Sequence, residues 1–297
     1  MRNSPTAAAA AADGADREFD FSQADFEQIR ALIYDRAGIA LSPAKRDMVY
    51  SRLARRLRAL SLRRFADYLQ LLREEGNDQE WEAFTNSLTT NLTAFFREPH
   101  HFPILAEHLL RDPGRALSVW CSAASTGEEP YSLAMTAVEA FGSFTPPVKI
   151  IASDIDTQVL EKAQAGVYAL ERLEKMSEDR VRRFFLKGSG ARLGFAKVRP
   201  ELQRLVSFEQ INLLESPWSI RGSLDAIFCR NVMIYFDKQT QANILRRFAP
   251  LMRSDALLFV GHSESLLHVA DTFQLLGRTV YKLAGSRAPD NVAAQAK

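Results

Sequence analysis

Hydrophobic residues recur at helical spacing from Phe21 to about Arg111. Ser22 with Asp25 three residues later predicts a capped helix start, and Ser42-Pro43 predicts a second helix with proline in its first turn. The apolar stripe of this second helix consists of Val49, Leu53, Leu57 and Leu60. Further helices are predicted over 64–74, over 79–88, and from about 98 to 111, where Asp112-Pro113-Gly114 ends the pattern.

Beyond this point short hydrophobic runs alternate with helical segments. The runs are ALSVWC, VKIIASD, LVSFEQINL, LDAIFCRN and ALLFVGHSE. Such alternation predicts a parallel sheet with helices on both faces. The last run, TFQLLGRTVYKL, is split by Gly277-Arg278 and predicts an antiparallel hairpin at one sheet edge. Parallel strands followed by such a hairpin are typical of S-adenosylmethionine-dependent methyltransferases.

The segment 187–206 does not fit the alternation. It holds Gly188, Gly190, Gly194 and Pro200 among the short runs RLGFAKV and LQRLVSF. We predict a small inserted β unit here, with a long loop as the alternative.

Composition adds few constraints. With 46% hydrophobic and 25% charged residues and a net charge of +2, the chain has the balance of a soluble globular protein. No run of 18 apolar residues predicts a membrane span. The alanine-rich residues 1–18 are interpreted as a disordered tail, with a secretory signal peptide as the alternative, and residues 286–297 as a second tail. We therefore expect a cytoplasmic protein without direct membrane insertion.

Cysteine and histidine give no sign of a metal centre. Cys121 and Cys229 lie in apolar runs and are expected to be reduced core thiols. His100 and His101 are adjacent, so on a helix their side chains should point about 100° apart. The sequence therefore predicts no metal.

The first predicted strand is followed by small residues, Ser122–Gly127, and then by Glu128 and Glu129. Ligands of open parallel sheets bind at the carboxyl ends of strands. The turn lacks the GxGxxG spacing, and its two acids would repel a pyrophosphate, which disfavours a nicotinamide dehydrogenase. An acid here suits a cation such as an amino acid's ammonium group; the alternative is a charge that complements the helix dipole.

The ends of the next strands also carry polar groups. Asp154 can accept hydrogen bonds from ribose hydroxyls, while Asp156 is predicted to cap the following helix. The amide of Asn212 suits an adenine edge. After the fourth run come Arg230 and Asn231, and then Tyr235-Phe236, which core packing alone could also explain.

Several long motifs occur together and in order: SLTTNLTAFFRE (87–98), WCSAASTGEEPYS (120–132), ASDID (152–156), INLL (211–214), FCRNVMIYFD (228–237) and GHSES (261–265). They closely resemble the chemotaxis receptor glutamate methyltransferase family, CheR. The resemblance implies an N-terminal all-α domain (19–92) and a doubly wound α/β methyltransferase domain (93–285). The β-subdomain is inserted at about 187–206.

The resemblance also implies an activity and a site. The enzyme would transfer a methyl group from S-adenosylmethionine to glutamates on the cytoplasmic helices of methyl-accepting chemotaxis receptors, which produces sensory adaptation. Tyr235 and Arg97 would be catalytic, Tyr235 beside the transferred methyl and Arg97 on the donor's carboxylate. Glu129 would meet the donor's amino group and Asp154 its ribose. The remaining pocket residues would be Asn91, Thr93, Asn212, Leu213, Arg230 and Asn231.

The predicted helix within residues 44–64 is strongly basic, which bears on the partner of the protein. Ala44–Arg64 holds eight basic residues and one acid, and Arg52, Arg55 and Arg56 fall at i, i+3 and i+4. A solvated face or phosphate binding would each explain this. The resemblance favours docking of an acidic receptor helix and no nucleic-acid partner. A methyltransferase of RNA or a small molecule, and a non-enzymatic receptor adaptor, remain alternatives. A peptide tether on the β-subdomain is a further expectation.

Overall fold

The computed structural model describes residues 17–286, which form two compact units. The first contains the chain up to Arg36 and then Ala40–Leu88. The second contains Ala37–Ile39 and the chain from Thr89 onward. Nearly all of the two predicted tails lies outside the described residues. Arg17 and Glu18, at the edge of the first predicted tail, form ion pairs with Asp47 and Arg58.

The N-terminal unit is all α, as the residue pattern predicted. Its elements are α1 (Gln23–Ala37), η1 (Pro43–Lys45), α2 (Arg46–Ala59), α3 (Phe65–Arg73) and α4 (Asp78–Leu88). At the start of α1, the Ser22 amide donates to Asp25 and the Asp25 amide donates to the Ser22 hydroxyl, which confirms the predicted cap. Pro43 begins a 3₁₀ turn that leads directly into α2.

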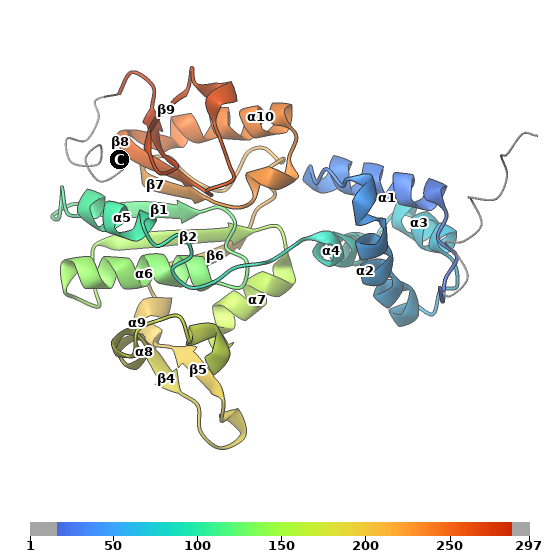
Figure 1. Cartoon of the computed structure of the whole chain (residues 1–297), viewed down its shortest axis with the longest axis horizontal. Coiled ribbons are helices and arrows are strands. Elements are labelled where there is room, and N and C mark those ends of the chain that lie inside the picture. The colour runs from blue at the N-terminus through green and yellow to red at the C-terminus, as the bar shows by residue number, and fades with distance from the viewer. Residues whose placement is uncertain (1–16, 287–297) are drawn as a thin grey trace, which may run out of the picture. The chain divides into compact units, whose positions relative to one another are not determined.

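The second unit is built on a seven-stranded sheet (Figure 1). The strand order is β6-β2-β1-β7-β8-β10-β9, and the first five of these are parallel. The hairpin β9–β10 is antiparallel and lies at the sheet edge, as predicted. The bounds are β1 Leu117–Cys121, β2 Val148–Asp154, β6 Val206–Gln210, β7 Leu224–Cys229, β8 Met252–Val260, β9 Phe273–Gly277 and β10 Val280–Leu283.

Each face of the sheet has its own hydrophobic core. Val119 and Cys121 of β1 contribute to the core under α5 and α6, while Trp120 between them contributes to the core under α10. This alternation follows from the two-residue period of a strand and explains why the runs are hydrophobic throughout. The helices of this domain are α5 (His101–Leu109), α6 (Glu128–Phe141), α7 (Thr157–Ala165) and α10 (Lys238–Phe248), with 3₁₀ turns η4 (Met233–Tyr235), η5 (Ala249–Leu251) and η6 (Leu267–Val269).

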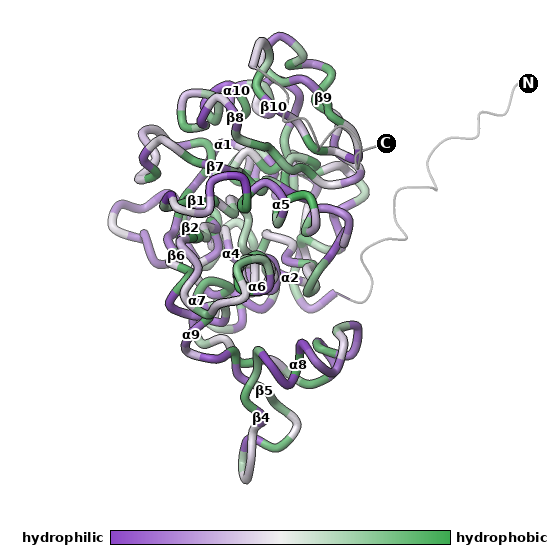
Figure 2. Tube along the Cα trace, turned by 90° about the vertical axis from the view of Figure 1, so that its left-hand side faces the viewer, coloured by the Kyte–Doolittle hydropathy of each residue, from purple (hydrophilic) through white to green (hydrophobic). Residues whose placement is uncertain are grey.

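A small antiparallel sheet, order β3-β5-β4, confirms that the chain carries an inserted β unit. Figures 1 and 2 show that β4 and β5 project away from the large sheet. The small sheet includes β3, so it begins before the predicted insert at 187–206. The prediction missed β3 because its three residues give too short a pattern to recognise. Its elements are β3 (Val167–Ala169), η2 (Leu170–Leu173), α8 (Glu178–Phe184), β4 (Phe185–Lys187), η3 (Gly190–Arg192), β5 (Phe195–Val198) and α9 (Pro200–Gln203).

Candidate active site

The strand order reverses beside β1: the chain passes from β1 to β2 on one side and later adds β7 on the other. The carboxyl ends of the strands at such a reversal form the ligand crevice of an open α/β sheet. Several motif segments identified in the sequence meet here, and three of them, 87–98, 120–132 and 228–237, carry strained backbone. Phe96, Glu98, Ser125 and Asn231 are four of the eight non-glycine residues with positive φ in the described part of the chain.

Asp154, at the end of β2, is buried and holds the loop after β1. One carboxylate oxygen accepts the Ser125 amide at 2.8 Å, and the other accepts the Asp156 amide at 3.0 Å. Burial raises the pKa of Asp154 to about 6, although these backbone donors oppose the rise. Its carboxylate is therefore fixed and changes charge close to neutral pH.

Asp156 caps α7, which confirms its predicted role. Its Oδ1 accepts the amides of Gln158 and Val159 at 3.0 and 3.3 Å. Its Oδ2 accepts the Thr89 hydroxyl at 2.7 Å and the Asn91 amide nitrogen at 2.8 Å. Asn91 is thus anchored beside the end of β2, next to the loop that Asp154 holds.

Glu129 and Arg230 form a buried ion pair, with Oε2 and Nη1 2.7 Å apart. Burial raises the pKa of Glu129, and Arg230 opposes this rise. The Arg230 guanidinium also donates to the Arg97 carbonyl and lies 3.5 Å from Glu98 Oε2. Cys121 donates its thiol hydrogen to Glu129 at 3.3 Å, and burial raises the pKa of this thiol, so it stays a thiol.

Glu128 has a different partner from Glu129. Arg172, from η2 of the β-subdomain, pairs with its carboxylate and also donates to the Thr93 carbonyl at 3.0 Å. The Tyr168 hydroxyl, on β3, donates to the Thr126 carbonyl at 2.8 Å. Gly127, with φ +97°, leaves room for that ring, because a Cβ there would lie 2.7 Å from the Tyr168 oxygen. The β-subdomain therefore braces the loop after β1.

The loop after β7 is held by Glu264, a residue of the GHSES motif to which the sequence alone assigned no role. Its buried carboxylate accepts the amides of Asn231 at 2.8 Å and Gly261 at 2.6 Å. The Asn231 side chain donates to Glu98 at 3.3 Å, and the Tyr235 hydroxyl lies 3.5 Å from the Thr90 carbonyl. The acid three residues after Gly261 was the signal that could have identified this role.

Three predicted pocket residues are engaged in contacts within the protein. The Asn212 side chain accepts the Leu214 amide at 3.0 Å and donates to Glu215 at 3.2 Å, so its amide closes its own loop. Leu213 is buried, and its carbonyl accepts from Arg247 at 3.0 Å. The Arg97 side chain donates to the Leu92 carbonyl at 2.9 Å.

In the N-terminal unit, the three predicted substrate-binding arginines differ in environment. Arg56 donates twice to Glu80, at 3.0 and 2.5 Å, and the buried Tyr68 hydroxyl donates to the same carboxylate. Arg52 is half-buried and donates to the Ser87 carbonyl at 3.4 Å. Arg55 is exposed. Arg56 is thus part of the packing of α2 against α4, which sequence spacing alone did not reveal.

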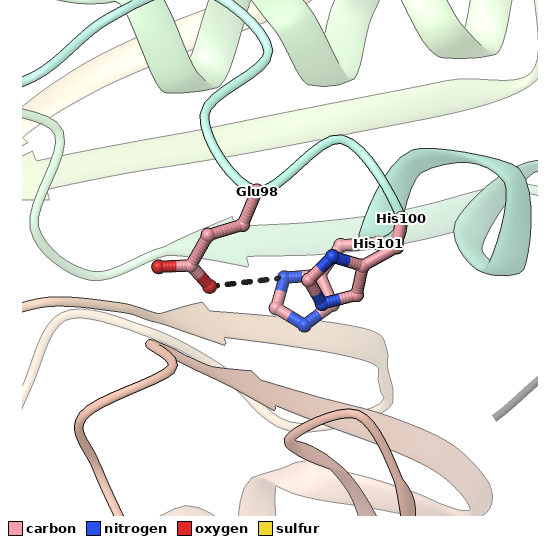
Figure 3. Close-up of side chains that lie close together, drawn as sticks. All are labelled: Glu98, His100 and His101. Carbon is pink, nitrogen blue, oxygen red and sulfur yellow. Dashed lines mark ion pairs between the residues drawn. The ribbon is translucent and has the colours of Figure 1, made fainter. Parts of the chain in front are cut away.

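Glu98, His100 and His101 lie close together at the start of α5 (Figure 3). The two imidazole ring centroids are 4.3 Å apart. The two rings therefore lie against each other, contrary to the prediction that they point apart, although His100 has helical dihedrals and His101 is the first residue of α5. Burial, reinforced by Arg230, lowers the pKa of His101 to about 3. The pKa of Glu98 falls to about 2 despite its burial, because Arg230 and His262 favour the carboxylate.

The sheet order, with acids and amides at the strand ends beside the reversal, defines an S-adenosylmethionine-dependent methyltransferase domain. Residues 91–282 match the family model described as "CheR methyltransferase, SAM binding domain", and residues 24–89 match "CheR methyltransferase, all-alpha domain". The chain belongs to the CheR methyltransferase family, as the sequence motifs indicated.

Curated relatives agree with this assignment. The chain is 55% identical to the "Chemotaxis protein methyltransferase" of Salmonella typhimurium over 267 residues, which are 90% of this chain and 92% of the relative. It is 55% identical to "Chemotaxis protein methyltransferase 2" of Pseudomonas aeruginosa, covering 90% and 96%. The Escherichia coli "Chemotaxis protein methyltransferase" is 54% identical, covering 89% and 92%. Within residues 17–286, no helix has the length and apolar character needed to span a membrane.

Proposed function

We propose that this S-adenosylmethionine-dependent methyltransferase methylates glutamate side chains on the cytoplasmic helices of chemotaxis receptors, and so resets their signalling during adaptation. The observation that carries the proposal is the buried set of Glu98, Glu129 and Arg230 at the strand reversal, in a chain whose relatives are named for chemotaxis. The protein would act in the cytoplasm.

The site suits a cationic methyl donor. The carboxylates of Glu98 and Glu129 outnumber the Arg230 guanidinium by one, and the Arg97 guanidinium, which also acts on Glu129, would balance that charge until it pairs with the donor's carboxylate. Glu129 would meet the donor's ammonium group, sharing its carboxylate with Arg230, and Asp154 would accept from the ribose hydroxyls. Arg97 would hold the donor's carboxylate. The other proposed pocket residues are Asn91, Thr93, Asn212, Leu213, Arg230 and Asn231, of which Asn212 would contribute after its local contacts rearrange.

The reaction needs little acid–base help from the protein. When bound, S-adenosylmethionine supplies an electrophilic methyl group on a sulfonium cation. A glutamate has an ordinary pKa of about 4.3, so the substrate is already a carboxylate at neutral pH. The protein's contribution would be alignment, which can supply about 7–11 kcal/mol in favourable cases. Tyr235 would orient the reacting carboxylate through its hydroxyl without ionising.

Receptor docking would use the exposed part of the basic helix α2. Arg55, and Arg52 to a smaller extent, would face the glutamate-rich receptor helix. Arg56 takes no direct part in this revised proposal, since Glu80 already occupies its guanidinium.

The β-subdomain would provide a second contact with the receptor. β4 is an edge strand of the small sheet, and Leu186 and Phe195 on this sheet are exposed hydrophobic side chains. An open edge of this kind can accept an extended peptide as an additional strand. The exposed Arg192 could then meet an acidic residue or the terminal carboxylate of a receptor tail. Such a tether would raise the enzyme's local concentration, to about the mM range for a short flexible linker.

The test supplies tritiated methyl donor with three acceptors in parallel: receptor-containing membranes, total RNA and a small-molecule extract. The proposal predicts label in the receptor alone. Label in RNA would support the alternative methyltransferase. Donor binding without label in any acceptor, or no donor binding at all, would support a receptor adaptor without enzymatic activity.

A further inference from the structure

Glu98, His100 and His101 bring three potential metal ligands together on one short segment. One ligand atom from each lies within 4.8 Å of the other two, and Figure 3 shows the three side chains converging. Glu98 Oε2 is 3.9 Å from His101 Nδ1. Proximity alone does not make a metal site, because a ligand atom must also have a lone pair that no hydrogen bond already uses.

The His101 ring has one nitrogen assigned by its contacts. Its Nε2 lies 2.9 Å from the Arg278 carbonyl oxygen and 3.1 Å from the Thr279 hydroxyl. A carbonyl can only accept, so Nε2 carries the hydrogen and the neutral ring leaves a bare lone pair on Nδ1. The ring is fully buried, and Nδ1 has no hydrogen-bond partner among residues 17–286.

Glu98 presents a matching acceptor. Its Oε1 is satisfied by the His262 amide at 3.3 Å, the His262 ring at 3.1 Å and the Asn231 side chain at 3.3 Å. Its Oε2 is buried and accepts no hydrogen bond from any described residue; the nearest cation is Arg230 at 3.5 Å. Two lone pairs therefore face each other across 3.9 Å with no donor between them.

We propose that Glu98, His100 and His101 bind a divalent transition-metal ion of the Zn²⁺ type. Two imidazoles and one carboxylate are a donor set that zinc prefers. A metal-binding histidine usually donates its other ring N–H to a carbonyl, as His101 does to Arg278. Two ligands about 2.1 Å from one ion lie about 3.4 Å apart in a tetrahedral site, so Glu98 and His101, now 3.9 Å apart, would need to approach by about 0.5 Å. His100 is half-buried and can swing inward.

Arg230 sets the strength of this site. Its guanidinium is 3.5 Å from the same Glu98 oxygen, so a bound cation would be repelled. Two contacts moderate the repulsion: Glu129 at 2.7 Å neutralises Arg230, and the Arg97 carbonyl holds it in place. The ion would fix the 97–101 segment against the β9–β10 turn and thereby stabilise the loop that carries Arg97.

The experiment titrates ZnCl₂ into the full chain without a histidine tag by calorimetry, and records the visible absorption spectrum with CoCl₂. We expect one ion per chain, and His100→Ala should weaken Zn²⁺ binding by at least about tenfold and remove the cobalt spectrum. The control is His268→Ala, a histidine on η6, which should bind as the wild type does. Absence of binding at millimolar Zn²⁺, or equal binding by His100→Ala, overturns the proposal and leaves a buried water as the occupant.

A second variant avoids dependence on a single ligand, the half-buried His100. Glu98→Gln keeps the side-chain volume and removes the charge, and it should also abolish the cobalt spectrum. Circular dichroism establishes whether this variant is folded. If the folded Glu98→Gln chain retains the wild-type cobalt spectrum, the ion binds elsewhere and the assignment is wrong.

Discussion

Arg230 and Glu129 are 101 positions apart in the sequence, yet Arg230 Nη1 lies 2.7 Å from Glu129 Oε2 in the interior of the methyltransferase domain. The pair joins the end of β7 to the start of α6, the two elements that flank the strand reversal. It is therefore both a structural link and a part of the proposed donor site.

Replacing only Arg230 should lower the free energy of unfolding more than replacing both members of this pair. Arg230→Met leaves Glu129 as a buried unpaired carboxylate, and we expect a loss of about 3–5 kcal/mol in the free energy of unfolding. The double variant Arg230→Met with Glu129→Gln should recover part of that loss, because position 129 then carries no unpaired charge, although Glu98 still lacks its Arg230 neighbour. Urea unfolding of Arg230→Met, Glu129→Gln and the double variant measures the coupling. Strictly additive losses would show that the pair does not interact as described.

Donor affinity should depend on pH through Asp154. Its pKa in the folded protein is raised to about 6, and the proposed ribose contacts need the carboxylate. Affinity for S-adenosylhomocysteine should therefore fall as pH drops through 6 and reach a plateau above 7. Calorimetry from pH 5 to 8 measures this. Asp154→Asn should bind weakly at every pH and lose this dependence; the same pH profile in the variant would assign the titration to another group.

The pH dependence of stability that Asp154 causes runs in the opposite direction to that of donor affinity. Burial raises the pKa of Asp154 above its ordinary value of 3.8, so the folded state holds this proton more tightly than the unfolded chain. Its contribution to stability is present below pH 4 and is lost as pH rises through about 6. In Asp154→Asn, stability should therefore decline less between pH 4 and 7 than in the wild type. Urea midpoints at the two pH values test this, and equal declines would contradict it.

Arg55 and Arg56 should behave differently although they are neighbours. Arg55→Glu should fold normally but slow receptor methylation, most strongly at low salt, because it places like charges together. Arg56→Glu should instead destabilise the N-terminal unit by about 3 kcal/mol or more, since it leaves Glu80 facing a like charge. Thermal unfolding and methylation rates across a salt series separate the two effects. Equal methylation by Arg55→Glu and wild type would make this face merely solvated.

Tyr235→Phe should lower turnover with a modest effect on donor affinity. The hydroxyl makes one long contact, 3.5 Å from the Thr90 carbonyl, so it is available to the reacting groups. Single-turnover methylation and donor calorimetry on the same preparation measure the two quantities. Wild-type turnover in a folded variant would reduce Tyr235 to a packing residue.

The sequence was informative where a signal is local. The capped start of α1 and the terminal hairpin follow from short patterns, and the structure has both. The cap at Asp156 was predicted for the same reason. The partner of Arg56, the bracing of Glu128 by Arg172, and the role of Glu264 depend on contacts between distant segments, which residue spacing does not encode. The contact between the His100 and His101 rings was missed because helical spacing gives the direction in which each side chain leaves the backbone and not the rotamers that bring two rings together.

The central claim is that receptor glutamates accept the methyl group as an ester. The most direct measurement incubates the enzyme and tritiated donor with receptor membranes, and then releases volatile methanol with base. A second receptor, with its methylation-helix glutamates replaced by glutamine, is treated in parallel. The account predicts base-labile tritiated methanol from the first receptor and none from the second. Label that resists base, or equal release from both receptors, would contradict it.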